Sequence, residues 1–190
     1  MIYAGYDEVH NTYKEVSGAI IIGYIGKINK SKGCHYLNSF AERIFDNTGN
    51  KLIVAGTGDN DLIDGFDETV IEYLGFSEPS DFYKRVDAIV IPSIWYDPLP
   101  RVIYEAMSHN VVPFVSVYTG GKNVVSQIDP KLLFDPETEG SIKEVSKNIT
   151  DINFLNAMKG KIASLTKKRK FSIEKASEQY IEFYNAVVQD

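Results

Sequence analysis

The sequence is poor in cysteine, in histidine and in long apolar runs. Its 190 residues include a single cysteine, Cys34, which excludes an internal disulfide framework and fits a reducing compartment such as the cytoplasm. No apolar run approaches the roughly 20 residues of a membrane span, and residues 1–7 lack a signal-peptide pattern. The three histidines, His10, His35 and His109, show no metal-ligand spacing with one another or with Cys34. We therefore expect a cytoplasmic globular protein without a metal site.

Positive charge is also scarce. The chain has 20 Lys and Arg against 26 Asp and Glu, a formal net charge of -6. This balance argues against a nucleic-acid-binding surface, which would show a basic stripe. The basic run Lys167–Lys170 is typical of a solvated helix end, where cations interact favourably with the helix dipole. A contact of this run with a membrane surface stays open as a second interpretation.

Apolar segments of strand length alternate with helical patterns. Continuous apolar runs predict strands buried on both faces at residues 19–25, 52–55, 70–74, 88–91, 111–117 and 132–134. Helical spacing predicts helices at residues 34–45, 80–86, 99–109, 141–149 and 152–166, and a last helix capped by Ser172. This alternation predicts an α/β fold with a doubly wound parallel sheet flanked by helices.

The same patterns divide the chain into three parts. Residues 1–18 are polar and weakly patterned, so we interpret them as a linker or edge segment. Residues 19–170 contain all the predicted strands and form the α/β domain. Residues 171–190 carry the terminal helix.

The first candidate site is the loop after the first strand, residues 23–33. Glycines such as Gly26 let backbone amides approach an anion, and the helix that follows offers its positive end. Lys27 and Lys32 add mobile charges suited to a diphosphate. A lysine-bearing surface loop explains the same residues, because the loop has neither P-loop nor dinucleotide-fingerprint spacing.

The second candidate site is a pair of carboxylates, Asp97 and Glu105, which follow the predicted strand 88–91. Ligands of open α/β proteins bind at the carboxyl edge of the sheet, and carboxylates there can accept hydrogen bonds from sugar hydroxyls. Each residue also has a structural explanation. Asp97 before Pro98 has the pattern of a helix N-cap, and Glu105 lies four residues after Arg101, the spacing of a surface ion pair.

A third candidate is the glycine pair that follows the predicted strand 111–117. Gly120 and Gly121 would supply amides or make room for a ligand at the same edge of the sheet. A simple chain reversal explains these two glycines equally well.

Taken together in chain order, these motifs resemble the C-terminal, donor-binding half of a GT-B glycosyltransferase of the group 1 (family 4) type. The resemblance runs from about residue 20 to residue 117 and becomes weaker toward the C-terminus. It rests on Gly26-Lys27 with Lys32-Gly33, Leu-Ile-Val-Ala-Gly-Thr-Gly at 52–58, Tyr-Leu-Gly-Phe at 73–76, the Pro-Ser, paired-acid and Ala-Met signature at 92–107, and Gly120-Gly121. Five matches in the correct order are far more specific than any one of them.

The resemblance implies a Rossmann-like domain and a role for each matching residue. Lys27 and Lys32 would hold the nucleotide diphosphate and stabilise its developing charge, and Asp97 would contact the donor sugar near the reacting carbon. These three residues are the predicted catalytic residues. The predicted donor-binding residues are Gly26, Lys27, Lys32, Phe76, Asp97, Leu99, Glu105, Gly120 and Gly121, with Glu105 on the ribose hydroxyls. The reaction implied is glycosyl transfer from a UDP- or GDP-sugar with retention of configuration, without a metal or another cofactor.

The resemblance also implies a partner. Enzymes of this type have an N-terminal acceptor-binding domain, for which this chain has no room. We therefore expect residues 171–190 to dock on that missing domain and the chain alone to bind the donor without transferring it. A peripheral membrane contact would then belong to the full-length enzyme.

Several departures from the family pattern keep other functions open. Lys27 stands where arginine is usual, Asp97 is one methylene shorter than the usual glutamate, and Val124 replaces a frequent glutamate. Asn110 fills a position that is usually glycine, a mild change because asparagine tolerates a left-handed helix cap. One alternative is a non-catalytic nucleotide-binding or assembly module. The other is half of a nucleotide-sugar epimerase or of a polysaccharide phosphorylase with the same architecture.

Overall fold

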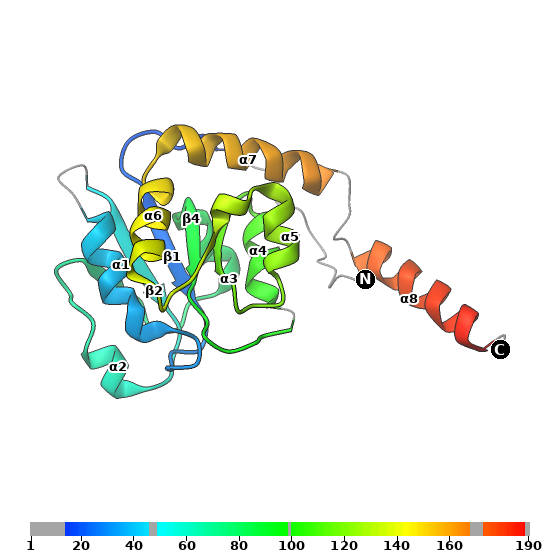
Figure 1. Cartoon of the computed structure of the whole chain (residues 1–190), viewed down its shortest axis with the longest axis horizontal. Helices are drawn as coiled ribbons and strands as arrows, with labels where there is room; N and C mark the ends of the chain where they lie inside the picture. The colour runs from blue at the N-terminus through cyan, green and yellow to red at the C-terminus, as the bar shows by residue number, and fades with distance from the viewer. Residues whose placement is uncertain (1–13, 46–48, 99, 168–172, 189–190) are drawn as a thin grey trace.

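The computed structural model describes residues 14–45, 49–98, 100–167 and 173–188 (Figure 1). The predicted cap at Ser172, the position of Leu99 and residues 168–170 of the basic run lie outside these residues. Within them, no helix is both long enough and apolar enough to cross a membrane.

A parallel sheet of six strands forms the centre of the molecule, in the order β3-β2-β1-β4-β5-β6. The strands are β1 (Ile21–Ile25), β2 (Lys51–Ala55), β3 (Ile71–Tyr73), β4 (Ala88–Ile91), β5 (Val112–Ser116) and β6 (Leu133–Phe134). The chain moves outward from β1 to β3 and then returns to β4 beside β1 before moving to β6. Strand order therefore reverses between β1 and β4, and the crevice beyond their carboxyl ends is the expected ligand site.

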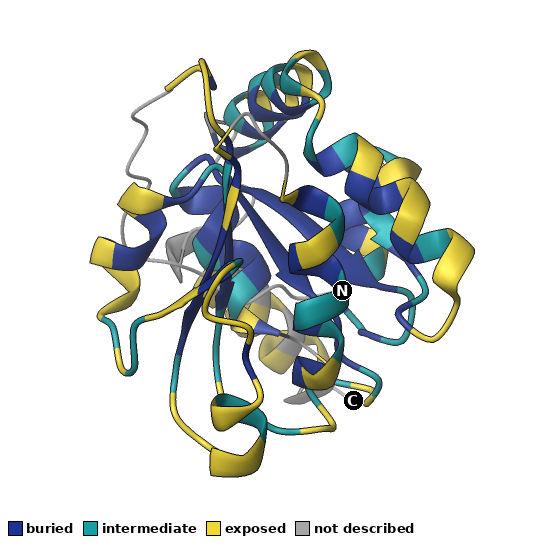
Figure 2. Cartoon of the chain, turned by 90° about the vertical axis from the view of Figure 1, so that its left-hand side faces the viewer, coloured by how far each residue is buried: buried dark blue, intermediate teal, exposed yellow. Residues whose placement is uncertain are grey.

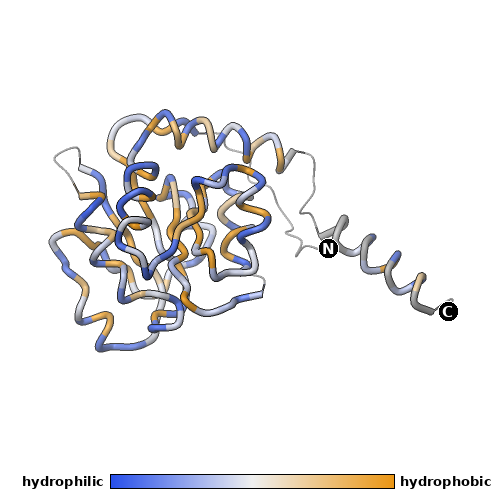
Figure 3. Tube along the Cα trace, in the orientation of Figure 1, coloured by the Kyte–Doolittle hydropathy of each residue, from blue (hydrophilic) through white to orange (hydrophobic). Residues whose placement is uncertain are grey.

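Helices cover both faces of this sheet (Figures 1 and 2). The helices are α1 (Leu37–Ile44), α2 (Asn60–Asp64), α3 (Pro79–Arg85), α4 (Arg101–Ser108), α5 (Lys122–Ile128), α6 (Glu139–Ile149), α7 (Ile152–Lys167) and α8 (Ile173–Val188). Hydrophobic residues concentrate in the strands and on the inward helix faces (Figure 3). In α1, for example, Leu37, Phe40, Ala41 and Ile44 are buried because they share one face of the helix.

The predicted architecture is confirmed, and its six strands are all present. Helices α2 and α5 are additions that we did not predict. Helix α2 has only five residues, too few to show a helical period. Its N-cap is Asp59, whose side chain accepts a hydrogen bond from the Asp61 amide. Helix α5 begins directly after Gly121, where we predicted at most a turn.

One predicted backbone feature is confirmed at the end of α4. Asn110 has φ 57°, and among the described non-glycine residues it alone has a positive φ. Asparagine adopts this left-handed conformation more readily than most residues, which allows it to replace the glycine that usually ends a helix.

Candidate functional site

Two glycine-containing loops form the floor of the site, which we define as residues 26–28 and 56–58. The floor extends the pairing of β1 and β2 beyond their ends: Ile28 pairs with Gly58, and the Ile28 amide donates to the Thr57 carbonyl at 3.0 Å. A Cβ atom added at Gly56, where φ is +138°, would lie 1.8 Å from the Gly26 carbonyl oxygen. The two loops therefore approach each other more closely than any side chain would permit.

A pocket of about 470 Å³ opens above this floor. Its volume lies in the range of small-molecule sites, roughly 300–1,000 Å³. The lining residues are Ile25, Gly26, Lys27, Gly56, Thr57, Gly58, Phe76, Ser77, Pro79, Val102 and Glu105. The structure thus brings together four of the predicted site residues, Gly26, Lys27, Phe76 and Glu105. The Phe76 ring is 73% exposed at the rim, which suits stacking against a planar ligand.

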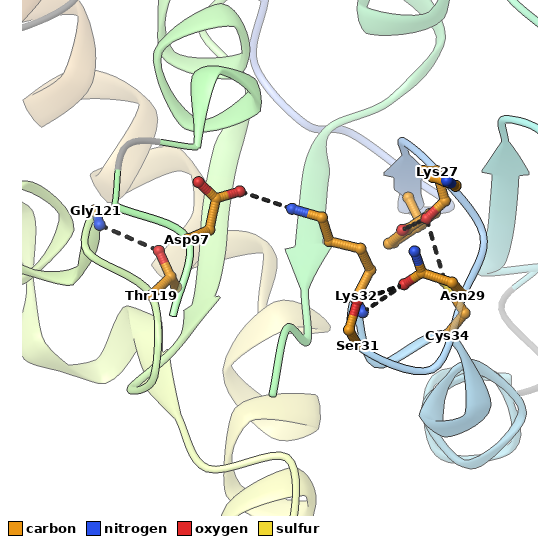
Figure 4. A network of polar contacts seen from close by, with 9 residues as sticks. Lys27, Asn29, Ser31, Lys32, Cys34, Asp97, Thr119 and Gly121 are labelled. Atoms are coloured by element: carbon orange, nitrogen blue, oxygen red, sulfur yellow. Dashed lines mark hydrogen bonds and ion pairs between the residues drawn. The ribbon is translucent and has the colours of Figure 1, made fainter. Parts of the chain in front are cut away.

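A smaller pocket of about 150 Å³ adjoins the first, and Gly26, Lys27 and Val102 line both. Two further predicted residues, Lys32 and Asp97, line this smaller pocket. They form an ion pair, with 2.6 Å between the Lys32 ammonium and the Asp97 carboxylate (Figure 4). This ion pair is partly exposed and joins the loop after β1 to the loop after β4.

The alternative assignment of Asp97 as a helix N-cap is wrong. Helix α4 begins only at Arg101, and its N-cap residue is Pro100, which provides no side-chain cap. Proline at position 100 disfavours helical backbone at the residue before it, so the helix starts three residues later than the Asp-Pro pattern predicts. The Asp97 carboxylate instead contacts Lys32.

Backbone contacts hold the Asp97 loop on two sides. The Ile94 amide donates to the Ser31 carbonyl at 3.1 Å, and the Gly120 amide donates to the Asp97 carbonyl at 2.8 Å. Gly120 and Gly121 line neither of the two pockets. In this structure they support the loop: a Cβ atom at Gly120 would lie 2.3 Å from the Pro98 carbonyl oxygen.

Glu105 carries the carboxylate of the larger pocket, and its side chain is 19% exposed. The predicted ion pair with Arg101 is present but long, with 3.7 Å between Arg101 Nη2 and Glu105 Oε1. The other oxygen, Oε2, lies 3.2 Å from the hydroxyl of Tyr83, a buried residue of α3. The same hydroxyl lies 3.3 Å from the Val102 carbonyl. Sequence patterns did not single out Tyr83, which has the spacing of an ordinary core residue.

We expect Tyr83→Phe to weaken nucleotide binding by roughly three- to tenfold, because one hydrogen bond to a site carboxylate contributes about 0.5–1.5 kcal/mol. Calorimetric titration measures this change, with Tyr36→Phe as the matched control. In a Glu105→Ala background the same substitution should have no further effect, because its partner is already absent. An equal loss in both backgrounds would contradict the role of Tyr83 in orienting Glu105.

The backbone of Lys27 is fixed by two buried residues. The Tyr24 hydroxyl donates to the Lys27 carbonyl at 2.8 Å, and the Cys34 thiol lies 3.9 Å from the same oxygen. Burial raises the pKa of the Tyr24 phenol and also that of the Cys34 thiol, so both groups remain neutral donors. The backbone of Lys27, a residue that lines both pockets, is therefore held in place. Over the part of the chain that the structure describes, no group of three or more His, Cys, Asp or Glu residues could hold a metal ion.

The reversal of strand order, the two glycine loops and the carboxylate beyond β4 define a domain of the GT-B glycosyltransferase type. Solved structures share this fold. HepE from Anabaena in complex with UDP superposes with a TM-score of 0.80 at 17% identity, covering 97% of this chain and 57% of that one. TarM from S. aureus, in a complex that contains UDP, gives a TM-score of 0.77 at 17% identity, over 95% and 38% of the two chains.

The sequence matches the family model described as "Glycosyl transferases group 1" over residues 19–151, and the chain belongs to this family. Two curated relatives are similar to it. An uncharacterized 42.6 kDa protein in the cps region of Klebsiella pneumoniae is 28% identical over 167 residues, covering 86% of this chain and 40% of that protein. An uncharacterized glycosyltransferase of Methanocaldococcus jannaschii is 30% identical over 115 residues, covering 55% and 29%. The chain therefore spans less than half the length of these relatives.

Proposed function

We propose that this chain is the nucleotide-sugar donor-binding domain of a retaining, metal-independent glycosyltransferase. One observation carries the proposal: Glu105, Lys27 and the exposed Phe76 line a single pocket. These groups match the three parts of a nucleotide, namely ribose hydroxyls, phosphate and base. The UDP complexes of structures with the same fold support this interpretation.

The arrangement of the two pockets suggests how a donor would lie. Lys27 lines both pockets, so a diphosphate beside it would have the nucleoside in the larger pocket and the sugar in the smaller one. The sugar would then lie near the Lys32–Asp97 pair, where carboxylate oxygens can accept hydrogen bonds from its hydroxyls. Lys27 and Lys32 would stabilise the negative charge that develops on the departing diphosphate.

Donor binding would require this chain only, whereas glycosyl transfer would require a further domain. The chain covers 57% of HepE and less of TarM, and an acceptor site would come from a further domain. We propose that the chain binds the donor alone, that transfer needs the acceptor domain, and that α8 docks on that domain. Tyr180, Ile181 and Tyr184 of α8 are exposed, which supports a docking role.

Calorimetric titration with UDP, UDP-glucose, GDP and GDP-mannose tests the proposal. We expect one nucleotide pair to bind, with the sugar conjugate bound more tightly than the diphosphate. Asp97→Asn should reduce this difference without weakening binding of the diphosphate itself, because Asp97 faces only the smaller pocket. Absence of binding by all four ligands would overturn donor binding. Robust transfer by the purified chain would overturn the need for an acceptor domain.

A further inference from the structure

A third pocket lies at the opposite edge of the sheet, where β4 begins. It has a volume of about 180 Å³ and is lined by Lys14, Tyr83, Lys84, Arg85, Val86, Asp87, His109 and Lys159. Four of these side chains are basic and one is acidic, although the chain as a whole has a net charge of -6. Positive charge is therefore concentrated in a concave site that the proposed function does not use.

Lys159, on α7, is the most buried of the cationic residues that line this pocket. It is 3% exposed, yet its ammonium lies 3.8 Å from Asp87 Oδ1, which is longer than a hydrogen bond. The other oxygen of Asp87 already accepts a hydrogen bond from the Ile21 amide at 3.1 Å. Among residues 14–45, 49–98, 100–167 and 173–188, Asp87 is the ion-pair partner of this ammonium, and none forms a shorter hydrogen bond with it. An ammonium has three N–H donors, so oxygen acceptors inside the pocket can complete its hydrogen bonding.

The neighbouring cations add to this unbalanced charge. Burial is the main effect that lowers the pKa of Lys159; Asp87 raises it, and the charge of Lys14 lowers it again. Lys14 is kept near α7 because the backbone of Val16 exchanges two hydrogen bonds with the Asn156 side chain, at 2.8 and 3.2 Å. Two lysines, Lys14 and Lys159, thus line this pocket together with one carboxylate, that of Asp87.

Lys84 and Arg85, at the end of α3, complete the rim of the pocket. They form surface ion pairs with Asp81 and Glu72, at 2.9 and 2.7 Å. Such exposed pairs contribute about 0–1 kcal/mol, so these two side chains can turn toward a ligand at little cost.

We propose that this pocket binds a phosphate-sized oxyanion, with Lys159 as its central ligand and with Lys14, Lys84 and Arg85 around it. An oxyanion supplies several acceptors for the buried ammonium and neutralises the excess positive charge. The group can be free phosphate or the terminal phosphate of a larger molecule such as a lipid headgroup. The pocket lies at the start of β4, whereas the donor pocket lies beyond the strand ends, so the inference does not depend on the proposed function.

Titration of the whole chain with inorganic phosphate, against chloride at the same ionic strength, tests this site. Saturable binding is expected, and Lys159→Met should weaken it roughly tenfold or more because one charge-assisted hydrogen bond is lost. Lys14→Met should weaken binding by a smaller factor and provides a test if Lys159→Met does not fold. The control Lys143→Met removes an exposed lysine of α6 and should bind phosphate as the unaltered chain does.

Phosphate could also bind at the donor site, and Lys27→Ala separates the two sites because Lys27 lines both pockets there. Binding that is lost in Lys27→Ala but kept in Lys159→Met and Lys14→Met would overturn the proposal, as would the absence of phosphate-specific binding. Sedimentation with phosphatidylglycerol vesicles, compared with phosphatidylcholine vesicles, distinguishes the two sources. Vesicle binding that requires Lys159 would identify a lipid headgroup as the ligand of the pocket. Phosphate binding without vesicle binding would identify a free ion as its ligand.

Discussion

Replacing Glu105 by alanine should weaken nucleotide binding by roughly 30- to 700-fold, a loss of about 2–4 kcal/mol for the hydrogen bonds of one carboxylate with ribose hydroxyls. The effect should be large because this carboxylate lines the pocket directly and is only 19% exposed. Calorimetric titration with UDP or GDP, whichever the chain binds, gives the ratio of the dissociation constants of Glu105→Ala and the unaltered chain. We expect the free energy of unfolding to change much less.

Two comparisons identify the cause of that loss. Glu144→Ala removes the same charge from an exposed position of α6 and should leave affinity unchanged. The unaltered chain should prefer the nucleotide over its 2′,3′-dideoxy form, whereas Glu105→Ala should bind both equally. Full affinity in Glu105→Ala would point to the non-catalytic module in place of a glycosyltransferase donor site.

Gly56→Ala should lower the free energy of unfolding by more than about 3 kcal/mol or prevent folding, since a severe backbone clash and an unfavourable φ act together. Its new Cβ would lie 1.8 Å from a backbone oxygen, at a φ of +138° that side chains rarely adopt. Urea denaturation followed by circular dichroism measures the loss.

Gly160→Ala is the matched control, because a Cβ there meets nothing within 4 Å and the residue lies inside α7. It should stabilise the chain by about 0.5–1 kcal/mol through better helix propensity. If Gly56→Ala unfolded at the same urea concentration as the unaltered chain, the close approach of the two loops would be disproved.

The strands were predictable because buried parallel strands have continuous apolar sequences. Residues 88–91 were predicted with both ends correct, since a charged residue precedes this run and a proline follows it. Helix α2 escaped prediction because it has only five residues and none of them is fully buried. Its formation depends on the Asp59 cap and on its place between two strands, and apolar periodicity reports neither.

The site was predictable as far as the topology of the sheet determines it. Lys27 and Glu105 follow β1 and β4, and the adjacency of these strands brings both residues to one pocket. The position of Asp97 was harder to predict, because a local capping pattern competed with a contact to Lys32, 65 residues away. Tyr83 could not be identified at all, because its contact with Glu105 depends on how α3 packs beside α4.

The floor of the donor pocket has a consequence for how this domain can diversify. Where Gly56 meets Gly26 and Gly58 meets Ile28, main-chain atoms form the contact, so no exchange of side chains can remodel it without losing the fold. The rim, by contrast, consists of side chains such as Phe76 and Ser77, which can be exchanged individually. A lineage could therefore acquire a new preference for the base by mutation at the rim, while the inherited contact between the loops stays unchanged.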